Sequence, residues 1–242
     1  MNFDNLTNSE ELAEQTDSIG GRYIFSSDIY DAVISCIYLT ESKNGAMGAV
    51  VDLKINGKDF RETVWFTNKK GENFYLSKTD GTKQGLPGWN LLDALSMLSI
   101  GKGFKQALAS REEKVVKVFN FDLKKEVDTN VPVVMDLINA KIKVGILDQI
   151  VNKQEQNNQG EYVPVDETRE ENTISAVFNP ETLKTFAETK KGADAKFFED
   201  WLKKYKTGAP FDRSKKTGNM PSANKGGQRE VKKVDKTKLF GN

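Results

Sequence analysis

The chain of 242 residues contains no histidine and only one cysteine, Cys36. Without a second cysteine it cannot form an internal disulfide. Without histidine it cannot build a Cys/His zinc site or the Ser-His-Asp and Cys-His arrangements of nucleophilic catalysis. An enzyme of this composition would have to work through carboxylates, lysine or a hard metal ion. Cys36 lies in a strongly apolar stretch, which indicates a small core residue rather than a reactive thiol.

Long apolar runs are also absent, since no stretch approaches the roughly 20 residues that a membrane-spanning helix needs. Residues 1–17 are acidic and polar, which is not the composition of a secretory signal. A hydrophobic fraction of 37% is low but sufficient for a packed core. We therefore expect a soluble intracellular protein.

Charge is unevenly distributed along the chain, although the net charge is only +1. Residues 207–242 contain nine lysines and arginines against three acidic residues, which gives +6 and leaves −5 on residues 1–206. This segment is also too polar to bury much surface, which predicts a disordered basic tail. We expect a mobile acidic arm over 1–20, one domain over 21–206 and the tail over 207–242. The apolar tip Leu239-Phe240 is either a docking element or without a role.

The strongest local signal is the alternation of apolar and polar residues from Met47 to Phe66, interrupted by Asn56-Gly57. A period of two places successive side chains on opposite faces of a strand, and Asn-Gly favours a type I′ turn. The stretch therefore predicts a β-hairpin. In its second strand Arg61, Thr63 and Trp65 share one face.

An aromatic ring beside an arginine on a sheet face is one way to hold an unstacked base and its phosphate. The alternative interpretation is structural: Trp65 packs beneath a helix, and Arg61 pairs with Glu62 or Asp59.

Similar patterns predict the other elements. We expect strands at 28–40, 73–77, 115–121, 141–151 and 173–178, and helices at 89–100, 104–110, 180–190 and 194–205. Loops are expected over 78–88 and 154–162, and a helical turn within 131–138. The stretch 28–40 is apolar on both sides, with Ile29, Val33, Ile37 and Leu39 facing one way, so it predicts a central strand that bends and contacts two layers. The order of elements predicts an α+β fold, an OB-fold-like curled antiparallel β-sheet with helical insertions.

The predicted strands and loops carry aromatic and cationic side chains together. Such a surface can bind single-stranded DNA without regard to sequence, because every base can stack and every nucleotide has a phosphate. The candidate stacking residues are Tyr30, Tyr38, Trp65 and Tyr75. The candidate phosphate-binding residues are Lys54, Lys58, Arg61, Lys69, Lys70 and Lys78. We expect no metal, no cofactor and no catalytic residues.

Two segments could suggest a catalytic function. The string Ile100-Gly101-Lys102-Gly103 lacks the spacing of a phosphate-binding loop and is better explained as a corner between two helices. A metal-dependent nuclease would need clustered carboxylates, and Asp166, Glu167, Glu170 and Glu171 are close in sequence but lie in a polar loop.

Several short segments, in their order, resemble a family of single-stranded-DNA-binding proteins from tailed bacteriophages, podoviruses in particular. Among them are Leu86-Pro87-Gly88 and Val177-Phe178-Asn179-Pro180. The full set is 43–47, 86–88, 112–119, 131–132 with 137–138, 160–162 with 168–170, 177–180, 192–193 and 197–201. The resemblance runs from about residue 27 to 205 and rests on the spacing of these segments rather than on one diagnostic motif.

The resemblance implies a non-catalytic protein with an OB-like core that coats single-stranded DNA in phage replication and recombination, in the cytoplasm of the infected bacterial host. It also implies a role in transcription for some members. Replicative single-strand binders commonly end in an acidic tail, whereas this tail is basic. A basic tail could add phosphate contacts or engage a phage or host RNA polymerase. The alternative function is therefore a transcription cofactor that recruits an RNA polymerase to DNA.

Overall fold

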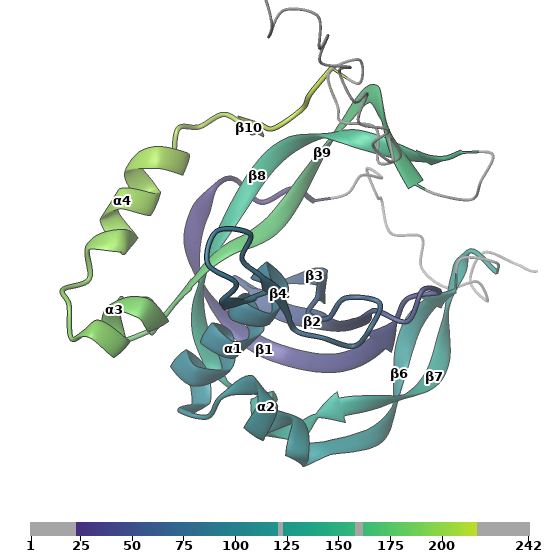
Figure 1. Ribbon diagram of the computed structural model, residues 1–242, viewed down its shortest axis with the longest axis horizontal. Coiled ribbons are helices and arrows are strands. Elements are labelled where there is room, and N and C mark those ends of the chain that lie inside the picture. Colours follow the sequence, from purple (N-terminus) through teal and green to yellow (C-terminus); the bar gives the residue numbers. More distant parts are fainter. Residues whose placement is uncertain (1–22, 121–122, 158–161, 217–242) are drawn as a thin grey trace, which may run out of the picture.

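The computed structural model describes residues 23–120, 123–157 and 162–216 (Figure 1). Its strands are β1 (Asp28–Glu41), β2 (Met47–Ile55), β3 (Lys58–Trp65), β4 (Phe74–Leu76), β5 (Lys83–Gly85), β6 (Arg111–Asn120), β7 (Lys125–Val134), β8 (Lys141–Gln156), β9 (Tyr162–Phe178) and β10 (Phe211–Asp212). Its helices are α1 (Pro87–Ile100), α2 (Phe104–Ala107), α3 (Phe186–Lys191) and α4 (Lys196–Tyr205), with 3₁₀ turns at Leu108–Ser110 and Met135–Leu137. A mostly antiparallel sheet with few helices confirms the α+β class.

β1 is the strand on which the main sheet is built, with the order β10-β8-β1-β2-β3. β2 occupies one edge of β1, while the other edge pairs first with β8 and then, at Tyr38, with β7. β9 pairs with β8, and β6 pairs with β7. The sheet therefore divides along β1 into two long hairpins, β6–β7 and β8–β9, which diverge in Figure 1.

A β-bulge lies at Ser35, where the register of β1 and β2 shifts between Ile34 and Cys36. Before the bulge Ala32 and Ile34 face the main core, and after it Ile37 does. A bulge inserts one residue and so exchanges the two faces of a strand. The prediction that β1 bends and contacts two layers is confirmed, but the prediction that one set of odd-numbered residues shares a face throughout is wrong.

The β2–β3 hairpin is confirmed. Asn56 and Gly57 have φ of 49° and 78°, the values that a type I′ turn requires. Alternate residues of both strands, including Val51 and Val64, are buried in the main core. Arg61 and Trp65 lie on the other face.

α1 covers the main core with Leu92 and Leu95, which are fully buried. It begins at Pro87, two residues before the predicted start, since proline is favoured in the first turn of a helix. It ends at Gly101, whose left-handed φ of 70° closes the last turn as predicted.

The helix predicted over 180–190 is wrong in its first half. The side-chain oxygen of Asn179 accepts hydrogen bonds from the backbone N–H groups of Glu181 and Thr182, which forms a turn. The helix begins only after Thr185, which makes a capping box with Glu188. α4 is confirmed, and its Trp201 packs beside Gly145 of β8.

Several strands were missed or predicted too short. β5 lies within the predicted loop 78–88. β7 begins at Lys125, where no strand was predicted, and covers the first half of the stretch 131–138, for which only a helical turn was predicted; the turn itself forms at Met135–Leu137. β8 and β9 are longer than predicted because thirteen cross-strand pairs support residues too polar for a local signal. β10, which pairs in parallel with β8, lies in the predicted tail. The predicted arm 1–20, the loop tip at 158–161 and residues 217–242 lie outside the described residues.

No helix among the described residues is long and apolar enough to cross a membrane.

Candidate nucleic-acid interface

Three residues form a row across three strands: Thr40 of β1 pairs with Gly48 of β2, which pairs with Trp65 of β3. Directly opposed residues in antiparallel strands point to the same face of the sheet. Because the middle residue has no side chain, the indole of Trp65 can lie down over β2. A Cβ added to Gly48 would be 2.8 Å from Cε3 of Trp65 and 3.3 Å from Cγ2 of Thr40.

The indole of Trp65 is therefore supported from below by the backbone of β2, and the residue is 45% exposed. Its position is fixed by packing before any ligand arrives. A flat aromatic ring with one supported side and one open side is suited to stacking on a planar base.

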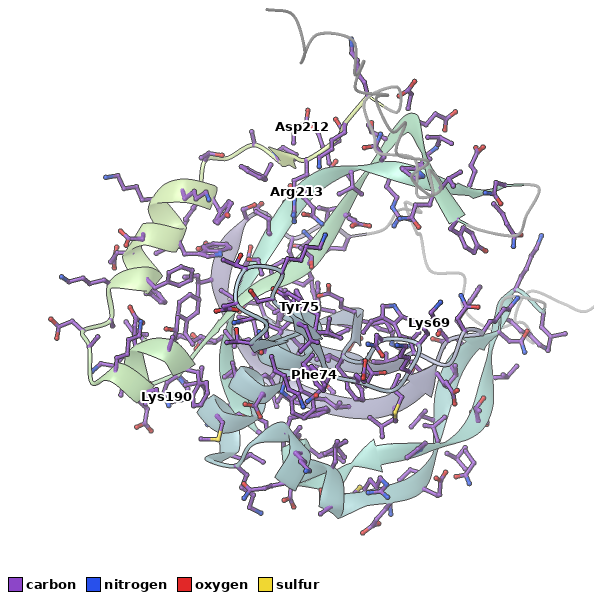
Figure 2. All side chains as sticks on the ribbon, viewed as in Figure 1. Lys69, Phe74, Tyr75, Lys190, Asp212 and Arg213 are labelled. Carbon is purple, nitrogen blue, oxygen red and sulfur yellow. The ribbon has the colours of Figure 1, made fainter. Side chains whose placement is uncertain are left out.

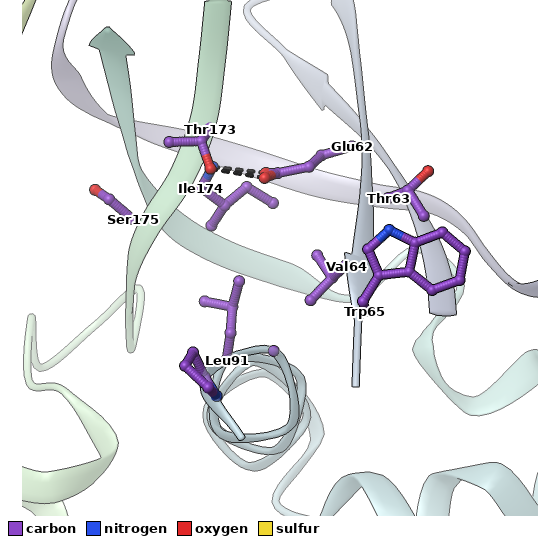
Figure 3. Close-up of a pocket in the computed structure, with 10 residues that line it drawn as sticks. Glu62, Thr63, Val64, Trp65, Leu91, Thr173, Ile174 and Ser175 are labelled. Atoms are coloured by element: carbon purple, nitrogen blue, oxygen red, sulfur yellow. Dashed lines mark hydrogen bonds between the residues drawn. The ribbon is translucent and has the colours of Figure 1, made fainter. Parts of the chain in front are cut away.

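α1 packs on the opposite side of β3 from this indole (Figure 3). Gly88, in the first turn of α1, lies so close to the backbone of Trp65 that a Cβ there would overlap the Trp65 carbonyl oxygen. The indole itself points away from Leu91 and α1. The alternative interpretation that Trp65 packs beneath this helix is therefore wrong.

The turn that follows β3 presents Lys69 and Lys70 to solvent. The side-chain oxygen of Asn68 accepts hydrogen bonds from the backbone N–H groups of Lys70 and Glu72, and Gly71 closes the turn with φ of 77°. Among the residues that the structure describes, neither lysine has an ion-pair partner. Two free cations on an ordered turn are available to hold phosphates.

The β4–β5 hairpin carries Tyr75, which is 53% exposed, and the turn with Lys78. The carboxylate of Asp80 accepts hydrogen bonds from Thr82, and hydrogen bonds from Ser77 and then from Thr82 lower the pKa of Asp80 below its usual value. In the view of Figure 2, Tyr75 lies near the centre and Lys69 to its right.

The β4–β5 hairpin is fixed to α1 and so to the end of β3. Asn90 of α1 donates a side-chain hydrogen bond to the carbonyl oxygen of Gly85, and the N–H of Leu86 donates to the carbonyl oxygen of Asn73. Since α1 also packs on the backbone of Trp65, the hairpin is held near the end of β3. Five exposed candidate residues lie at the end of β3, on the turn after it and on this hairpin, and we call them the Trp65 surface: Trp65, Lys69, Lys70, Tyr75 and Lys78.

The other three candidate cations already have partners within the chain. Lys54 pairs with Asp59 at 2.6 Å, and the ammonium of Lys58 lies 3.2 Å from the ring centroid of Tyr23. Arg61 makes two hydrogen bonds with Asp52, at 2.6 and 2.9 Å, and a longer contact with Glu126. The hydrogen bonds with Asp52 raise the pKa of Arg61 above its already high value. Arg61 thus pairs within the chain, though not with Glu62 or Asp59.

Two candidate tyrosines are held in the protein. Tyr38 is 3% exposed and packs with Val50 and Val133 in a second core, where residues of β6 and β7 cover the outer face of β1. The hydroxyl of Tyr30 donates a hydrogen bond to the carbonyl oxygen of Ser26, and its ring meets Phe25 edge-on. Burial is the main cause that raises the pKa of each tyrosine. In this conformation neither ring belongs to the Trp65 surface.

Sequence reasoning missed Gly48 and Thr40. Neither has the chemistry of a binding residue, and their role appears only when β1, β2 and β3 are placed in register. An Asn-Gly turn fixes the pairing of Gly48 with Trp65, so a search for glycine opposite an exposed aromatic in the predicted hairpin could have found the first of them.

A shallow pocket of about 350 Å³ lies between β3, α1 and β9, where β3 and β9 do not pair through their backbones. Glu62 bridges this seam: its carboxylate accepts hydrogen bonds from the hydroxyl of Thr173 and the backbone N–H of Ile174, both at 2.6 Å (Figure 3). Burial raises the pKa of Glu62, although these hydrogen bonds oppose the effect. Glu62 therefore links β3 to β9 and has a structural role in this pocket.

The carboxylates considered for a nuclease do not form a metal site. Glu167 pairs with Lys153 and Glu171 with Arg169, each within 2.8 Å. Among the described residues, no group of three or more acidic or cysteine side chains could hold a metal ion.

No known family model matches the chain, and no curated protein sequence matches it.

Proposed function

We propose that the chain is a non-catalytic protein that binds single-stranded DNA, largely without regard to sequence, through the Trp65 surface. The observation that carries the proposal is the indole of Trp65, which lies across Gly48 and is open on one side. The exposed Lys69 and Lys70, which have no ion-pair partner among the described residues, would supply the charges that phosphates require, and Tyr75 would supply a second exposed ring.

The strand connections support an OB-like architecture as part of the proposal. β1 pairs with β2 and β8, β2 pairs with β3, β8 pairs with β9, and a helix follows β3. The OB-fold is a partly open barrel that binds oligonucleotides on the face of its second and third strands. In an OB-like arrangement the outward face of β2 and β3, which carries Trp65, would correspond to that face, and the gap between β3 and β9 would correspond to the open part of the barrel.

The order of short segments that resembles phage single-strand binders leads us to propose the same biological setting. The protein would coat single-stranded DNA during replication and recombination in the cytoplasm of an infected bacterium. The basic tail would add phosphate contacts or recruit a polymerase.

The test is a titration of the full chain with a fluorescently labelled thymidine 20-mer, followed by anisotropy, at low and moderate salt. Stacking contributes about 1–3 kcal/mol per base, so Trp65→Ala should weaken binding by about 10-fold or more. Phe197→Ala is the matched control, because Phe197 is equally exposed, at 46%, on α4. The absence of wild-type binding at low salt would overturn the proposal.

Intrinsic fluorescence reports the contact itself. Of the three tryptophans, Trp201 is buried and Trp89 packs against the main core, which leaves Trp65 as the exposed one. Unlabelled oligonucleotide should quench the wild-type emission and leave that of Trp65→Phe nearly unchanged. Equal quenching in both proteins would show that DNA binds elsewhere.

Salt dependence tests the lysines. Each phosphate contact on a single strand contributes about −0.7 to the slope of log affinity against log salt. Replacing Lys69 and Lys70 by Gln should reduce the steepness by about 1.4. The adjacent lysines Lys190 and Lys191 of α3 are also exposed, and Figure 2 shows Lys190 away from Tyr75 and Lys69. The same change at these two lysines should leave the slope unaltered.

A further inference from the structure

One edge of β6 has no strand paired with it in the part of the chain that the structure describes. β6 pairs with β7 along its whole length, from Arg111 to Asn120, and no other described strand pairs with it. An unpaired edge of this length presents a row of backbone donors and acceptors that can pair with another strand. Proteins usually protect such edges or use them.

The side chains of β6 divide cleanly between two faces. Val116 and Val118 pack against the second core, and the alternation of the strand therefore points Glu113, Val115 and Lys117 outward. Val115 is 68% exposed. Because Val115 points away from the core, core packing does not explain an apolar residue at this position.

The sequence of β6 is complementary to itself in one antiparallel register. When two copies of a strand pair with two-fold symmetry, one residue lies on the axis opposite its own copy. With Val115 on the axis, Glu113 lies opposite Lys117 of the second copy, and Lys117 opposite Glu113 of the second copy. Opposite charges directly across a strand pair are stabilising.

The neighbouring registers match the charges less well. An axis at Lys114 or Lys117 places two lysines directly opposite each other, and an axis at Val116 pairs no opposite charges. An axis at Glu113 pairs Glu112 with Lys114 of the second copy, but it places the two copies of Glu113 opposite each other. Charge therefore favours the register with Val115 on the axis. We propose that two copies of the chain associate through β6, antiparallel, with Val115 on the two-fold axis.

This association joins the sheets of both copies into one through the two β6–β7 hairpins. It places Val115 against Val115 of the second copy on the outward face and supplies partners to the free edge. The Trp65 surface is on other strands, so the dimer and DNA binding are separate properties of the chain.

The first test is sedimentation equilibrium of the full chain at concentrations from about 1 to 200 μM. Wild type should reach twice the 27.1 kDa of one chain. Glu113→Lys and Lys117→Glu should each weaken association by at least 10-fold, because each places like charges opposite one another, and the double variant should restore it. A monomer at all concentrations, or a dimer unaffected by either single change, would overturn the proposal.

The second test fixes the register. In a Cys36→Ala background, which removes the native thiol, Val115→Cys should form a disulfide-linked dimer under mild oxidation, since the two β-carbons face each other. Lys117→Cys is the control, because its two copies are offset along the strands by about 13 Å. Efficient cross-linking at 117 but not at 115 would show that another register or another surface is used.

Discussion

Glu62 offers the most direct test of how β3 is held beside β9. Its carboxylate is the bridge between β3 and β9, with two hydrogen bonds of 2.6 Å to Thr173 and Ile174. Glu62→Ala removes both and leaves the N–H of buried Ile174 without its partner. At about 1.5 kcal/mol for each bond to a charged acceptor, we expect a loss of about 3 kcal/mol in the free energy of unfolding.

Glu62→Gln separates the bridge from its charge. The amide oxygen can accept from Ile174, and the amide NH₂ can donate to the hydroxyl of Thr173, so we expect a change within about 1 kcal/mol. Burial raises the pKa of Glu62, so the folded protein holds this proton more tightly than the unfolded chain. That stabilisation is complete below the unfolded pKa and is lost as pH rises through the folded pKa. Wild type therefore loses stability between pH 4 and pH 7, whereas Glu62→Gln has no such loss. The free energy of unfolding of Glu62→Gln minus that of wild type should be larger at pH 7 than at pH 4.

Urea denaturation at both pH values measures these differences. Glu181→Ala is the control, because Glu181 is exposed and its side chain accepts no described hydrogen bond. If the free energy of unfolding of Glu62→Ala lay within about 0.5 kcal/mol of the wild-type value, the contact between β3 and β9 would not depend on Glu62 and the reasoning would be refuted.

Three further changes test the structure elsewhere. Gly48→Ala should displace the indole of Trp65, because the new Cβ would be 2.8 Å from Cε3, and should weaken binding of a thymidine 20-mer about 5-fold in the anisotropy titration. Gly145→Ala places a Cβ 3.0 Å from the Trp201 ring and should cost about 1–3 kcal/mol of stability in thermal melts. Burial and the nearby charge of Glu170 raise the pKa of Asp148 to about 6. Wild type should therefore gain about 1 kcal/mol in the free energy of unfolding as the pH falls from 7 to 5, and Asp148→Asn should lack this gain. Urea denaturation at both pH values measures it.

The local elements of the fold were largely predictable. The β2–β3 hairpin followed from alternation and the Asn-Gly turn, and the end of α1 followed from Gly101, because these signals lie within a few neighbouring residues. β7 was mostly missed. Its first six residues are mostly polar, and they are held as a strand by pairing with β6 rather than by their own propensity.

The sequence predicted the types of residue at the candidate site, but it did not predict which of the candidate residues are exposed. The exposed rings of Trp65 and Tyr75 and the turn lysines follow from strand alternation and turn residues. Tyr38 shares the face of Trp65, yet it is buried, because β6 and β7 fold over that part of β1. No local sequence pattern predicts that β6 and β7 cover Tyr38.

The sequence by itself determined the class of the fold, the hairpin and the two faces of β3, because each depends on a period or a turn within one short stretch. Tertiary structure alone decided which residues of those faces remain open. Arg61 contacts Asp52 and Glu126, and the indole of Trp65 lies across Gly48, because the strand register and the path of β7 determine which residues surround each side chain. Contacts between residues that are far apart in the sequence produce no local sequence pattern from which they could be predicted.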